Sequence, residues 1–475
     1  MTSVLKPDIC VIGGGPGGLT VAAAAASFGV PVVLVERGKM GGDCLNYGCV
    51  PSKALIAAAR HAHDLSHGEA LGIANLRPAT DFGRVAAHVE RAIAAIAPND
   101  SKERFTALGV KVISAEGRFK DPRTLIAGDH EIRARRFVIA TGSSPAIPSI
   151  PGIEGVPFLT NETVFELKQT PERLIIIGGG PVGLELAQAH RRLGAEVTVI
   201  ETGAVLGRED PELTAAVKQQ LLDDGVNILE HAEVTRLERL GSSHIRAFVS
   251  DGKDIRGIEG SHLLVAVGRK PNIDALDLQN ASVAHDESGI KVSGKLRTTN
   301  PRIYAIGDVA GGPQFTNVAN HHAGIVIRSA LFRLPANATH DLVPRVTFTD
   351  PELAHIGLTE AQAREEGMRV TVLRSAFSDN DRAEAEGQTN GFIKLVIGRN
   401  GRIRGVSIVG RGAGEMMNFW SLALSKRMTL RDITAYIAPY PTLGEIGKRA
   451  AYSYFTPATQ NSILRGIIRF LRLFG

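Results

Sequence analysis

Short, mostly apolar runs alternate with helical stretches over the first two thirds of the chain. Residues 8–12, 32–35, 174–177 and 197–200 each form such a run. Strands of this kind are typical of parallel sheets that helices cover on both faces. From about Pro344 the pattern changes, because strands at 392–397 and 403–409 alternate with helices such as 415–425. The pattern therefore predicts an α/β fold followed by an α+β domain.

Two of the apolar runs open copies of one unit, which consists of a strand, a glycine turn, a helix and a second strand. In each copy three glycines stand in GxGxxG spacing, and an acid follows the first glycine by 23 positions. These residues are Gly13, Gly15, Gly18 and Glu36 in the first copy, and Gly178, Gly180, Gly183 and Glu201 in the second. Such glycines let backbone N–H groups reach a pyrophosphate at the helix N-terminus, while the acid binds a ribose diol. The repeat therefore predicts two dinucleotide sites.

A pair of cysteines, Cys44 and Cys49, follows the first glycine loop. Such a pair stores two electrons as a dithiol and returns them as a disulfide. Pro51 and the Ala-rich stretch from Lys53 to Arg60 predict a helix that starts near Cys49. The positive end of that helix would lower the pKa of Cys49 and favour its thiolate.

The position of the cysteines assigns the two dinucleotides. The first site lies next to the pair and is expected to hold a tightly bound FAD, and the second a nicotinamide nucleotide. Glu201 favours NADH, because a carboxylate there repels the 2′-phosphate of NADPH. Arg208 is close enough in sequence to keep NADPH as the alternative.

Three further apolar strands end at residues suited to a cofactor face. Residues 137–142 and 263–268 end in glycine, and residues 303–308 end in an acid. They place Thr141, Gly142, Gly268 and Asp308 as cofactor-binding candidates, with Asp308 expected to reach the flavin ribityl chain. The alternative interpretation is that each is a plain core strand.

Composition narrows the function classes. A chain of 475 residues suggests about three domains, and a net charge of +5 from scattered basic residues argues against nucleic acid. Three cysteines argue against an extracellular disulfide framework. No signal peptide and no run of about 18 apolar residues is evident, so we expect a cytoplasmic enzyme. The helical region 60–99 carries His61, His63, His67 and His88, but no Cys or carboxylate cluster supports a metal site there.

Together these motifs resemble the FAD-dependent pyridine nucleotide-disulfide oxidoreductases, a family that includes dihydrolipoamide dehydrogenase, glutathione reductase and mercuric reductase. The resemblance covers essentially the whole chain and rests on residues 13–18, 44–53, 140–142, 178–185, 268–272, 307–308 and the C-terminal domain. It implies two Rossmann-like dinucleotide-binding domains, for FAD and NAD, and a C-terminal α+β dimerisation domain. The expected boundaries are 1–155 for the first part of the FAD-binding domain, 156–275 for the NAD(P)H-binding domain, 276–343 for the central part that returns to FAD, and 344–475 for dimerisation.

The resemblance also implies roles for single residues. Cys44 would be the interchange thiol that meets substrate, and Cys49 the charge-transfer thiolate against the flavin. Lys53 would pair with Glu185 near the flavin and hold a positive charge where reduced flavin is anionic. The family forms homodimers in which the last domain completes the partner's active site.

One segment departs from the disulfide reductases of the family. Those enzymes carry a His-Pro, followed closely by an acid, as the base for thiol exchange. Here Tyr440 stands in place of the histidine, and Glu445 supplies the acid. A phenol with a pKa near ~10 cannot act as such a base at neutral pH. Mercuric reductases carry Tyr in a similar context, but this chain lacks their vicinal C-terminal cysteines and their N-terminal Cys-containing module.

These features predict an NADH-oxidising FAD enzyme that passes electrons through Cys44 and Cys49 to an acceptor near the partner's Tyr440. The acceptor classes are a metal ion, a quinone-like compound and a small disulfide. Dihydrolipoamide dehydrogenase is the alternative within the family, and a membrane-associated electron-transfer partner is the alternative outside it. Residues 461–475 are expected to include a basic amphipathic helix, which either touches the inner membrane or a partner, or packs on the dimer.

Overall fold

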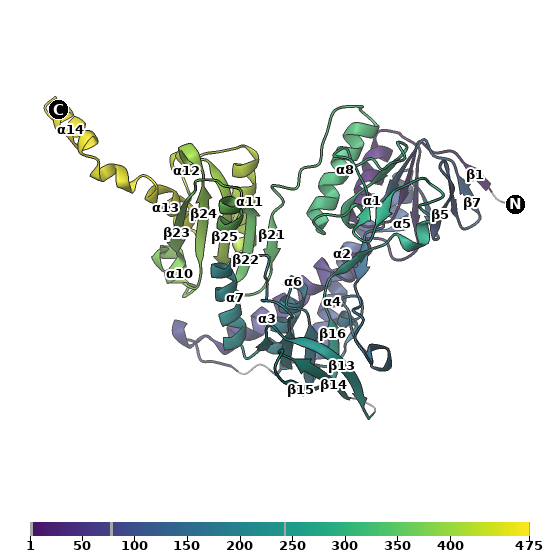
Figure 1. Ribbon diagram of the computed structural model, residues 1–475, viewed down its shortest axis with the longest axis horizontal. Coiled ribbons are helices and arrows are strands. Elements are labelled where there is room, and N and C mark those ends of the chain that lie inside the picture. Colours follow the sequence, from purple (N-terminus) through teal and green to yellow (C-terminus); the bar gives the residue numbers. More distant parts are fainter. Residues whose placement is uncertain (1–2, 77–78, 242–243, 475) are drawn as a thin grey trace.

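The computed structural model describes residues 3–76, 79–241 and 244–474. Three units surround a central region, each with its own sheets (Figure 1). The first unit carries the N-terminus, the second carries strands β10–β16, and the C-terminal unit lies on the opposite side from the first. Within the described residues, no helix has both the length and the apolarity needed to cross a membrane.

The first unit is built on a five-stranded parallel sheet in the order β20-β8-β2-β3-β4. Its strands are β2 (Ile9–Ile12), β3 (Val32–Glu36), β4 (Lys111–Ser114), β8 (Arg136–Ile139) and β20 (Ile303–Ala305). A four-stranded sheet beside it comprises β1 (Ser3–Leu5), β7 (His130–Ile132), β6 (Thr124–Ala127) and β5 (Gly117–Asp121). Because β20 comes from far along the chain, the polypeptide leaves this unit, builds the second one and returns.

Helices of the first unit follow its glycine turn and the cysteine segment. They are α1 (Pro16–Ser27), α2 (Gly42–Asn46), α3 (Cys49–Ser66), α4 (Phe82–Ile96), α5 (Lys102–Ala107) and α8 (Thr316–Ala330). The predicted helix near Cys49 is present and starts at that residue. The short helix α2, which carries Cys44, was not predicted. The region 60–99 is helical only in part, since α3 ends at Ser66 and α4 begins at Phe82.

The second unit repeats the parallel arrangement in the order β12-β11-β10-β16. Its strands are β10 (Arg173–Ile177), β11 (Glu196–Ile200), β12 (Asn227–Leu229) and β16 (His262–Val265), with β13 (Glu233–Leu240), β14 (His244–Ser250) and β15 (Ile255–Gly260) in an antiparallel sheet. Helix α6 (Pro181–Arg192) follows β10 and packs on α3, which joins the two dinucleotide-type units.

The C-terminal unit is an antiparallel sheet with helices, in the order β21-β22-β25-β24-β23. Its strands are β21 (Arg345–Thr347), β22 (Glu352–Gly357), β23 (Thr371–Ala376), β24 (Phe392–Ile397) and β25 (Ile403–Gly410). Its helices are α9 (Glu360–Glu365), α10 (Asp381–Ala385), α11 (Ala413–Ser425), α12 (Leu430–Ala435), α13 (Glu445–Ser453) and α14 (Ser462–Leu471). The predicted α/β fold with a C-terminal α+β domain is confirmed.

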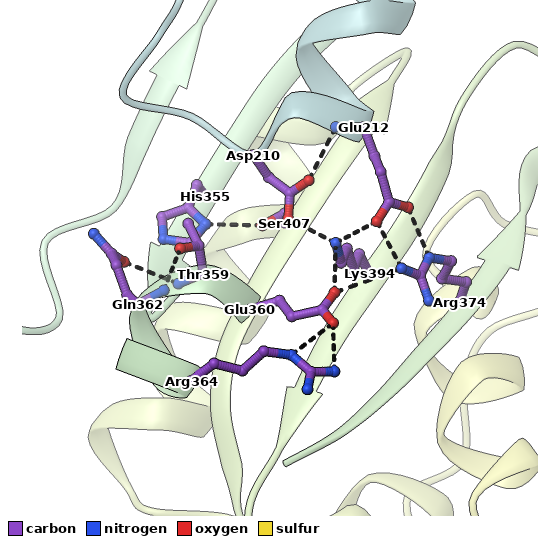
Figure 2. Close-up of polar contacts among 10 residues, drawn as sticks. All are labelled: Asp210, Glu212, His355, Thr359, Glu360, Gln362, Arg364, Arg374, Lys394 and Ser407. Atoms are coloured by element: carbon purple, nitrogen blue, oxygen red, sulfur yellow. Dashed lines mark hydrogen bonds and ion pairs between the residues drawn. The ribbon is translucent and has the colours of Figure 1, made fainter. Parts of the chain in front are cut away.

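An ion-pair cluster joins the second unit to the C-terminal sheet (Figure 2). Lys394 of β24 has a side chain only 3% exposed, and its ammonium lies 2.8 Å from Asp210, 2.6 Å from Glu212 and 3.0 Å from Glu360. Asp210 also caps α7 (Pro211–Asp223) by accepting a hydrogen bond from the backbone N–H of Glu212. Hydrogen bonds from Arg374, reinforced by Lys394, lower the pKa of Glu212 to about 2. The buried cation therefore ties the start of α7 to a sheet of another unit.

Candidate active site

Both glycine turns expose the N-terminus of a helix. Gly15 and Gly180 cap α1 and α6 in an extended conformation, and neither helix has a side chain capping its first turn. At Gly13, with φ +111°, a Cβ atom would stand 2.3 Å from the carbonyl oxygen of Ala140. At Gly18 it would stand 2.0 Å from the carbonyl oxygen of Gly13. The helix start can therefore pack against the strand ends, and its free N–H groups suit a pyrophosphate.

The second copy matches the first at its glycines. A Cβ at Gly178 would lie 2.4 Å from the oxygen of Ala266, and one at Gly183 would lie 2.0 Å from the oxygen of Gly178. Around Gly180 no heavy atom stands within 4 Å of that position, so the backbone there is open to close approach by a ligand. The repeat seen in the sequence is thus a repeat in space.

The two predicted acids occupy the same place in their units. Glu36 accepts hydrogen bonds from the N–H of Gly14 at 2.5 Å and of Gly38 at 2.6 Å. Glu201 accepts them from the N–H of Gly179 at 2.6 Å and of Gly203 at 2.9 Å. Each carboxylate is therefore held at the end of the second strand of its unit, where a ribose diol would bind. The uncapped helices and the placed acids fit two dinucleotides.

A continuous cavity of about 870 Å³ runs from the first glycine turn to the cysteines. The predicted residues that line it are Gly13, Gly15, Glu36, Cys44, Cys49, Lys53, Thr141, Gly142, Glu185 and Asp308. Pro181 and Val182 at the start of α6 line the same cavity. The second helix N-terminus therefore opens beside the region where the two cysteines lie.

The cysteines differ in their surroundings, although both are reduced in the structure. Cys44 lies on α2, and Cys49 is the first residue of α3, with its Sγ 3.5 Å from the hydroxyl oxygen of Thr316. A hydrogen bond from the Cys44 thiol, helped by Thr316 and the charge of Lys53, lowers the pKa of Cys49 to about 6. The same hydrogen bond, together with burial, raises the pKa of Cys44. At neutral pH the pair is therefore one thiolate, Cys49, and one thiol, Cys44.

Lys53 and Glu185 meet at the junction of the three units. The Lys53 ammonium lies 2.9 Å from Oε2 of Glu185, which is the pairing that the resemblance implies. The other carboxylate oxygen of Glu185 accepts a hydrogen bond of 2.8 Å from the backbone N–H of Phe348. The Lys53 ammonium also lies 4.3 Å from the centre of the Phe348 ring. The positive charge is thus fixed on the cavity wall by groups from α3, α6 and the segment before β22.

Asp308 and its neighbours form a polar corner of the cavity. Its Oδ2 accepts a hydrogen bond of 2.6 Å from the hydroxyl of Ser143, and burial raises its pKa. Arg269 donates to the Ser143 hydroxyl at 2.7 Å and lies 3.2 Å from Asp43. Ser143 and Arg269 belong to β9 (Ser143–Pro145) and β17 (Arg269–Pro271), which pair with each other. The strand ends predicted to face a cofactor therefore converge here.

Thr141 and Gly268 flank that corner. The Thr141 hydroxyl donates to the carbonyl oxygen of Asn272 at 2.7 Å. Gly268 has φ +137° and accepts a backbone hydrogen bond from Ala146, so it turns the chain from β16 into β17. Gly268 does not line the cavity, unlike Thr141 and Gly142.

Tyr440 and Glu445 lie apart from the cysteines of the same chain. Tyr440 is 70% exposed on the C-terminal unit, and its hydroxyl donates a 2.9 Å hydrogen bond to Asp381. That hydrogen bond raises the pKa of Tyr440 above its ordinary value. Glu445 begins α13, and neither residue lines the cavity. A role in catalysis therefore requires a second subunit, as the resemblance implies.

Several residues of the site were not found by sequence reasoning. Thr316 reaches Cys49 from the start of α8, Phe348 reaches Lys53, and Asp381 holds Tyr440. Asn161 donates to Asp43 at 2.9 Å, next to the cysteine segment. Each acts across a large sequence separation from a segment without a glycine or cysteine motif, so the sequence offers no local signal for it.

Two histidines of the helical region contact each other. The rings of His63 and His67 stack with their centres 3.9 Å apart, and His63 lies 3.8 Å from Asp224. Among the residues that the structure describes, no group of three or more His, Cys, Asp or Glu side chains is arranged to hold a metal ion.

Comparison with known proteins assigns the chain to a family. Residues 7–323 match the pyridine nucleotide-disulphide oxidoreductase family, and residues 343–451 match its dimerisation domain. The chain belongs to this family. The resemblance drawn from the motifs is therefore confirmed, and the protein is an FAD-dependent oxidoreductase that uses a pyridine nucleotide. The dimerisation domain supports a homodimer.

Relatives within the family differ in name and substrate. A mercuric reductase from Lysinibacillus sphaericus is 35% identical over 450 residues, which cover 94% of this chain and 82% of the relative. A dihydrolipoyl dehydrogenase from Geobacillus stearothermophilus is 33% identical over 459 residues, which cover 94% and 96%. A solved structure, the Cu(II) complex of the HOCl-induced flavoprotein disulfide reductase RclA from Escherichia coli, has a TM-score of 0.82 and 28% identity, over 92% of this chain and 98% of that one.

Proposed function

We propose that this flavoenzyme oxidises NADH and delivers the electrons through Cys44 and Cys49 to a thiophilic metal ion at the dimer interface. Quinone-like compounds and small disulfides are the other acceptor classes within the same proposal. The division of the pair into a Cys49 thiolate and a Cys44 thiol supports it, because Cys44 is then the group left to meet an acceptor.

The chain's own residues prepare the electron transfer. FAD held in this cavity would supply the hydride chemistry that links the nicotinamide to the cysteine pair, and the disulfide takes up two electrons and one proton to become the Cys44 thiol and the Cys49 thiolate. Lys53 holds a positive charge on the cavity wall, and Glu185 keeps that charge in place. Thr316 and the N-terminus of α3 stabilise the Cys49 thiolate.

The observation that carries the choice of acceptor is the environment of Tyr440. A disulfide substrate needs a base that takes and returns a proton near neutral pH. The Tyr440 hydroxyl already donates its proton to Asp381, and its pKa is raised. A soft metal ion bound by thiolates needs no such base, because its reduction transfers electrons to the metal ion and no proton. The names of a mercuric reductase and of a Cu(II) complex among the relatives support this class.

NADH is the proposed coenzyme. Glu201 is held by the backbone N–H groups of Gly179 and Gly203, at the end of the second strand of its unit. Its negative charge would oppose NADPH. Arg208 is exposed on the following loop and is the residue that would have to offset this charge.

Dihydrolipoamide dehydrogenase is the second candidate. The relative of that name is 33% identical to this chain, against 35% for the mercuric reductase, so identity does not separate the two. The oxidation of a dithiol would need a base at the position of Tyr440.

The deciding experiment reduces the purified holoenzyme with NADH under anaerobic conditions and follows flavin reoxidation by Hg²⁺, Cu²⁺, a soluble quinone, lipoamide and glutathione disulfide. We expect fast reoxidation by the metal ions and slow reoxidation by both disulfides. Tyr440→His should raise lipoamide turnover, since a general base contributes about 10²–10⁴ in rate. Tyr452→His, at another exposed tyrosine of the same unit, is the matched control. Efficient dihydrolipoamide oxidation by the wild type would refute the proposal in favour of the dehydrogenase.

A cytoplasmic location with peripheral contact to the inner membrane completes the proposal. The chain has only three cysteines, of which Cys10 is fully buried, and this argues against an extracellular disulfide framework. The membrane contact is assigned to residues 461–475, and an electron-transfer partner at the membrane is the alternative to free turnover in solution.

A further inference from the structure

The C-terminal helix α14 stands away from the rest of the molecule (Figure 1). Every residue from Phe455 to Phe474 is exposed. Asn461 caps the helix by accepting hydrogen bonds from the N–H groups of Ile463 and Leu464, so the segment is a defined helix. Large apolar side chains on this helix and directly after it are between 42% and 77% exposed: Ile463, Leu464, Ile467, Ile468, Phe470, Leu471, Leu473 and Phe474.

Apolar and basic side chains occupy opposite faces of this helix. Arg465, Arg469 and Arg472 follow one another at spacings of four and three, which places them along one side. Most of the apolar side chains recur at the same spacings along the other side. No Asp or Glu follows Glu445 in the sequence, so no acidic side chain of the tail balances the arginines.

We propose that α14 is an interfacial helix that docks the enzyme on an anionic lipid bilayer. The helix has ten residues, about half the ~20 needed to span a membrane, so it would lie in the plane of the surface. Its apolar face would enter the boundary between headgroups and acyl chains, while the arginines face lipid phosphates. This inference deepens the proposed peripheral contact but does not depend on which acceptor the enzyme reduces.

The positive charge of α14 favours binding to an anionic bilayer over packing against a second copy of the tail. Two such helices packed through their apolar faces would leave the arginines on their outer sides, with no acidic side chain of the tail to pair with them. A lipid surface rich in phosphate offers the complement to the arginines and a fluid apolar layer for the opposite face. The dimer would present two such helices, and two weak anchors on one particle raise the apparent affinity by on the order of 10²–10⁴ over one.

The test is flotation of the full-length, flavin-loaded dimer with two kinds of vesicle. One consists of phosphatidylcholine alone, and the other also contains about 30% phosphatidylglycerol, an anionic lipid that gives the surface a negative potential. We expect each tail to bind about 10²-fold tighter to the anionic vesicles at low salt, since each of its arginines contributes roughly a factor of five, and this preference should be lost at high salt. Arg465→Gln with Arg469→Gln and Arg472→Gln should abolish the preference. Ile467→Asn with Phe470→Asn should abolish flotation on both vesicles. Ile255→Asn, an exposed apolar residue of the second unit, is the matched control and should change nothing.

Dimer mass, flavin content and NADH oxidation are measured on the same samples. Equal binding to neutral and anionic vesicles, or tail variants that float like the wild type, would overturn the proposal. Tail variants that dissociate or aggregate would show that α14 packs on the partner subunit, which also overturns it. Flotation without NADH oxidation would refute the proposed activity and leave the docking surface standing, so the two failures are distinguishable.

Discussion

Three features from separate parts of the chain act on the ionisation of the Cys49 thiol. Its position at the start of α3 comes from the local sequence, the Cys44 thiol comes from α2, and the Thr316 hydroxyl comes from α8. The helix N-terminus favours the thiolate. The hydrogen bond from Cys44, helped by Thr316 and the charge of Lys53, lowers the pKa of this thiol to about 6. The charged form therefore predominates above this pH and is lost as the pH falls below it.

Replacing Thr316 tests its part in this balance. In the two-electron-reduced enzyme a long-wavelength thiolate-to-flavin absorption band should titrate with a midpoint near pH 6. Thr316→Val removes a hydrogen bond to the thiolate and should move the midpoint upward by about one unit. Thr316→Ser keeps the hydroxyl and should restore the wild-type midpoint. Cys49→Ser should abolish the band and Cys44→Ser should keep it; the same titration in all variants would exclude these roles.

Glu201 is the residue on which the proposed preference for NADH over NADPH depends. Glu201→Arg replaces a repelling charge by an attracting one, so the ratio of kcat/KM for NADH over NADPH should fall by about 10²-fold or more. Steady-state kinetics with both coenzymes measure it. Arg208→Gln is the control, and it should leave the wild-type ratio unchanged. A wild-type preference for NADPH that disappears in Arg208→Gln would show that Arg208 governs the choice.

At this scale the sequence reveals residues that belong to motifs and misses those that act from outside them. Gly13, Glu36 and Cys49 stand in fixed spacings that physical chemistry requires, so their places could be predicted. Thr316 and Phe348 have ordinary neighbours in the sequence and gain their importance only when α8 and the C-terminal unit reach the cavity.

At the scale of elements, α7 depends on a residue of another unit. Its capping residue Asp210 is 5% exposed and pairs with Lys394 on β24. The sequence predicts β24 as a strand but gives no reason for a lysine in its buried middle. That reason is the cluster of carboxylates from α7 and α9, which meets the strand only in the folded protein.

Replacing Lys394 should lower the free energy of unfolding, because the contact between α7 and β24 loses its cation. Lys394→Met leaves Asp210 and its neighbouring carboxylates without their shared partner, which typically costs about 3–5 kcal/mol when one member of a buried ion pair is lost. The protein has one tryptophan, Trp420, buried in the same unit, so its fluorescence during urea unfolding reports the change. Arg364→Met removes an exposed pair with Glu360 and should cost about 1 kcal/mol or less. Equal losses of unfolding free energy in the two variants would show that burial does not increase the contribution of the cluster to stability.

At the scale of the whole molecule, one chain does not bring together all the residues that we propose for the site. Cys44 and Cys49 line the cavity, whereas Tyr440 stands exposed on the C-terminal unit, near Ile437, which is 95% exposed. Such exposure of large side chains on a dimerisation domain is expected of a surface that a partner covers. The inference from sequence to a shared site rested on family resemblance, because no spacing within one chain encodes a contact between two.

Mixed dimers separate a shared site from a site within one chain. The proposed acceptor lies next to Tyr440 of the partner, so Tyr440→Phe should impair reduction of that acceptor. A heterodimer of one Cys44→Ser chain and one Tyr440→Phe chain then keeps one complete shared site of two and should show about half of the wild-type turnover. A wild-type chain paired with a chain that carries both substitutions should be nearly inactive. The two differently tagged chains are co-expressed, and heterodimers are isolated by sequential affinity steps. The reverse result would place Tyr440 with the cysteines of its own chain.

The position of β20 in the sequence determines the order in which the units can fold during synthesis. This strand closes the first parallel sheet next to β8, yet the ribosome makes it only after the whole second unit. Nascent chains are released N-terminus first and fold by units, so the second unit should be finished while the first still has an open edge at β8. Chains stalled after residue 300 should therefore resist protease in the region 156–275 but retain no flavin, and stalled chains that keep flavin would contradict this order. Flavin loading then becomes a late step of maturation, and a cell short of FAD would accumulate chains whose nicotinamide half is folded and whose flavin half is exposed to degradation.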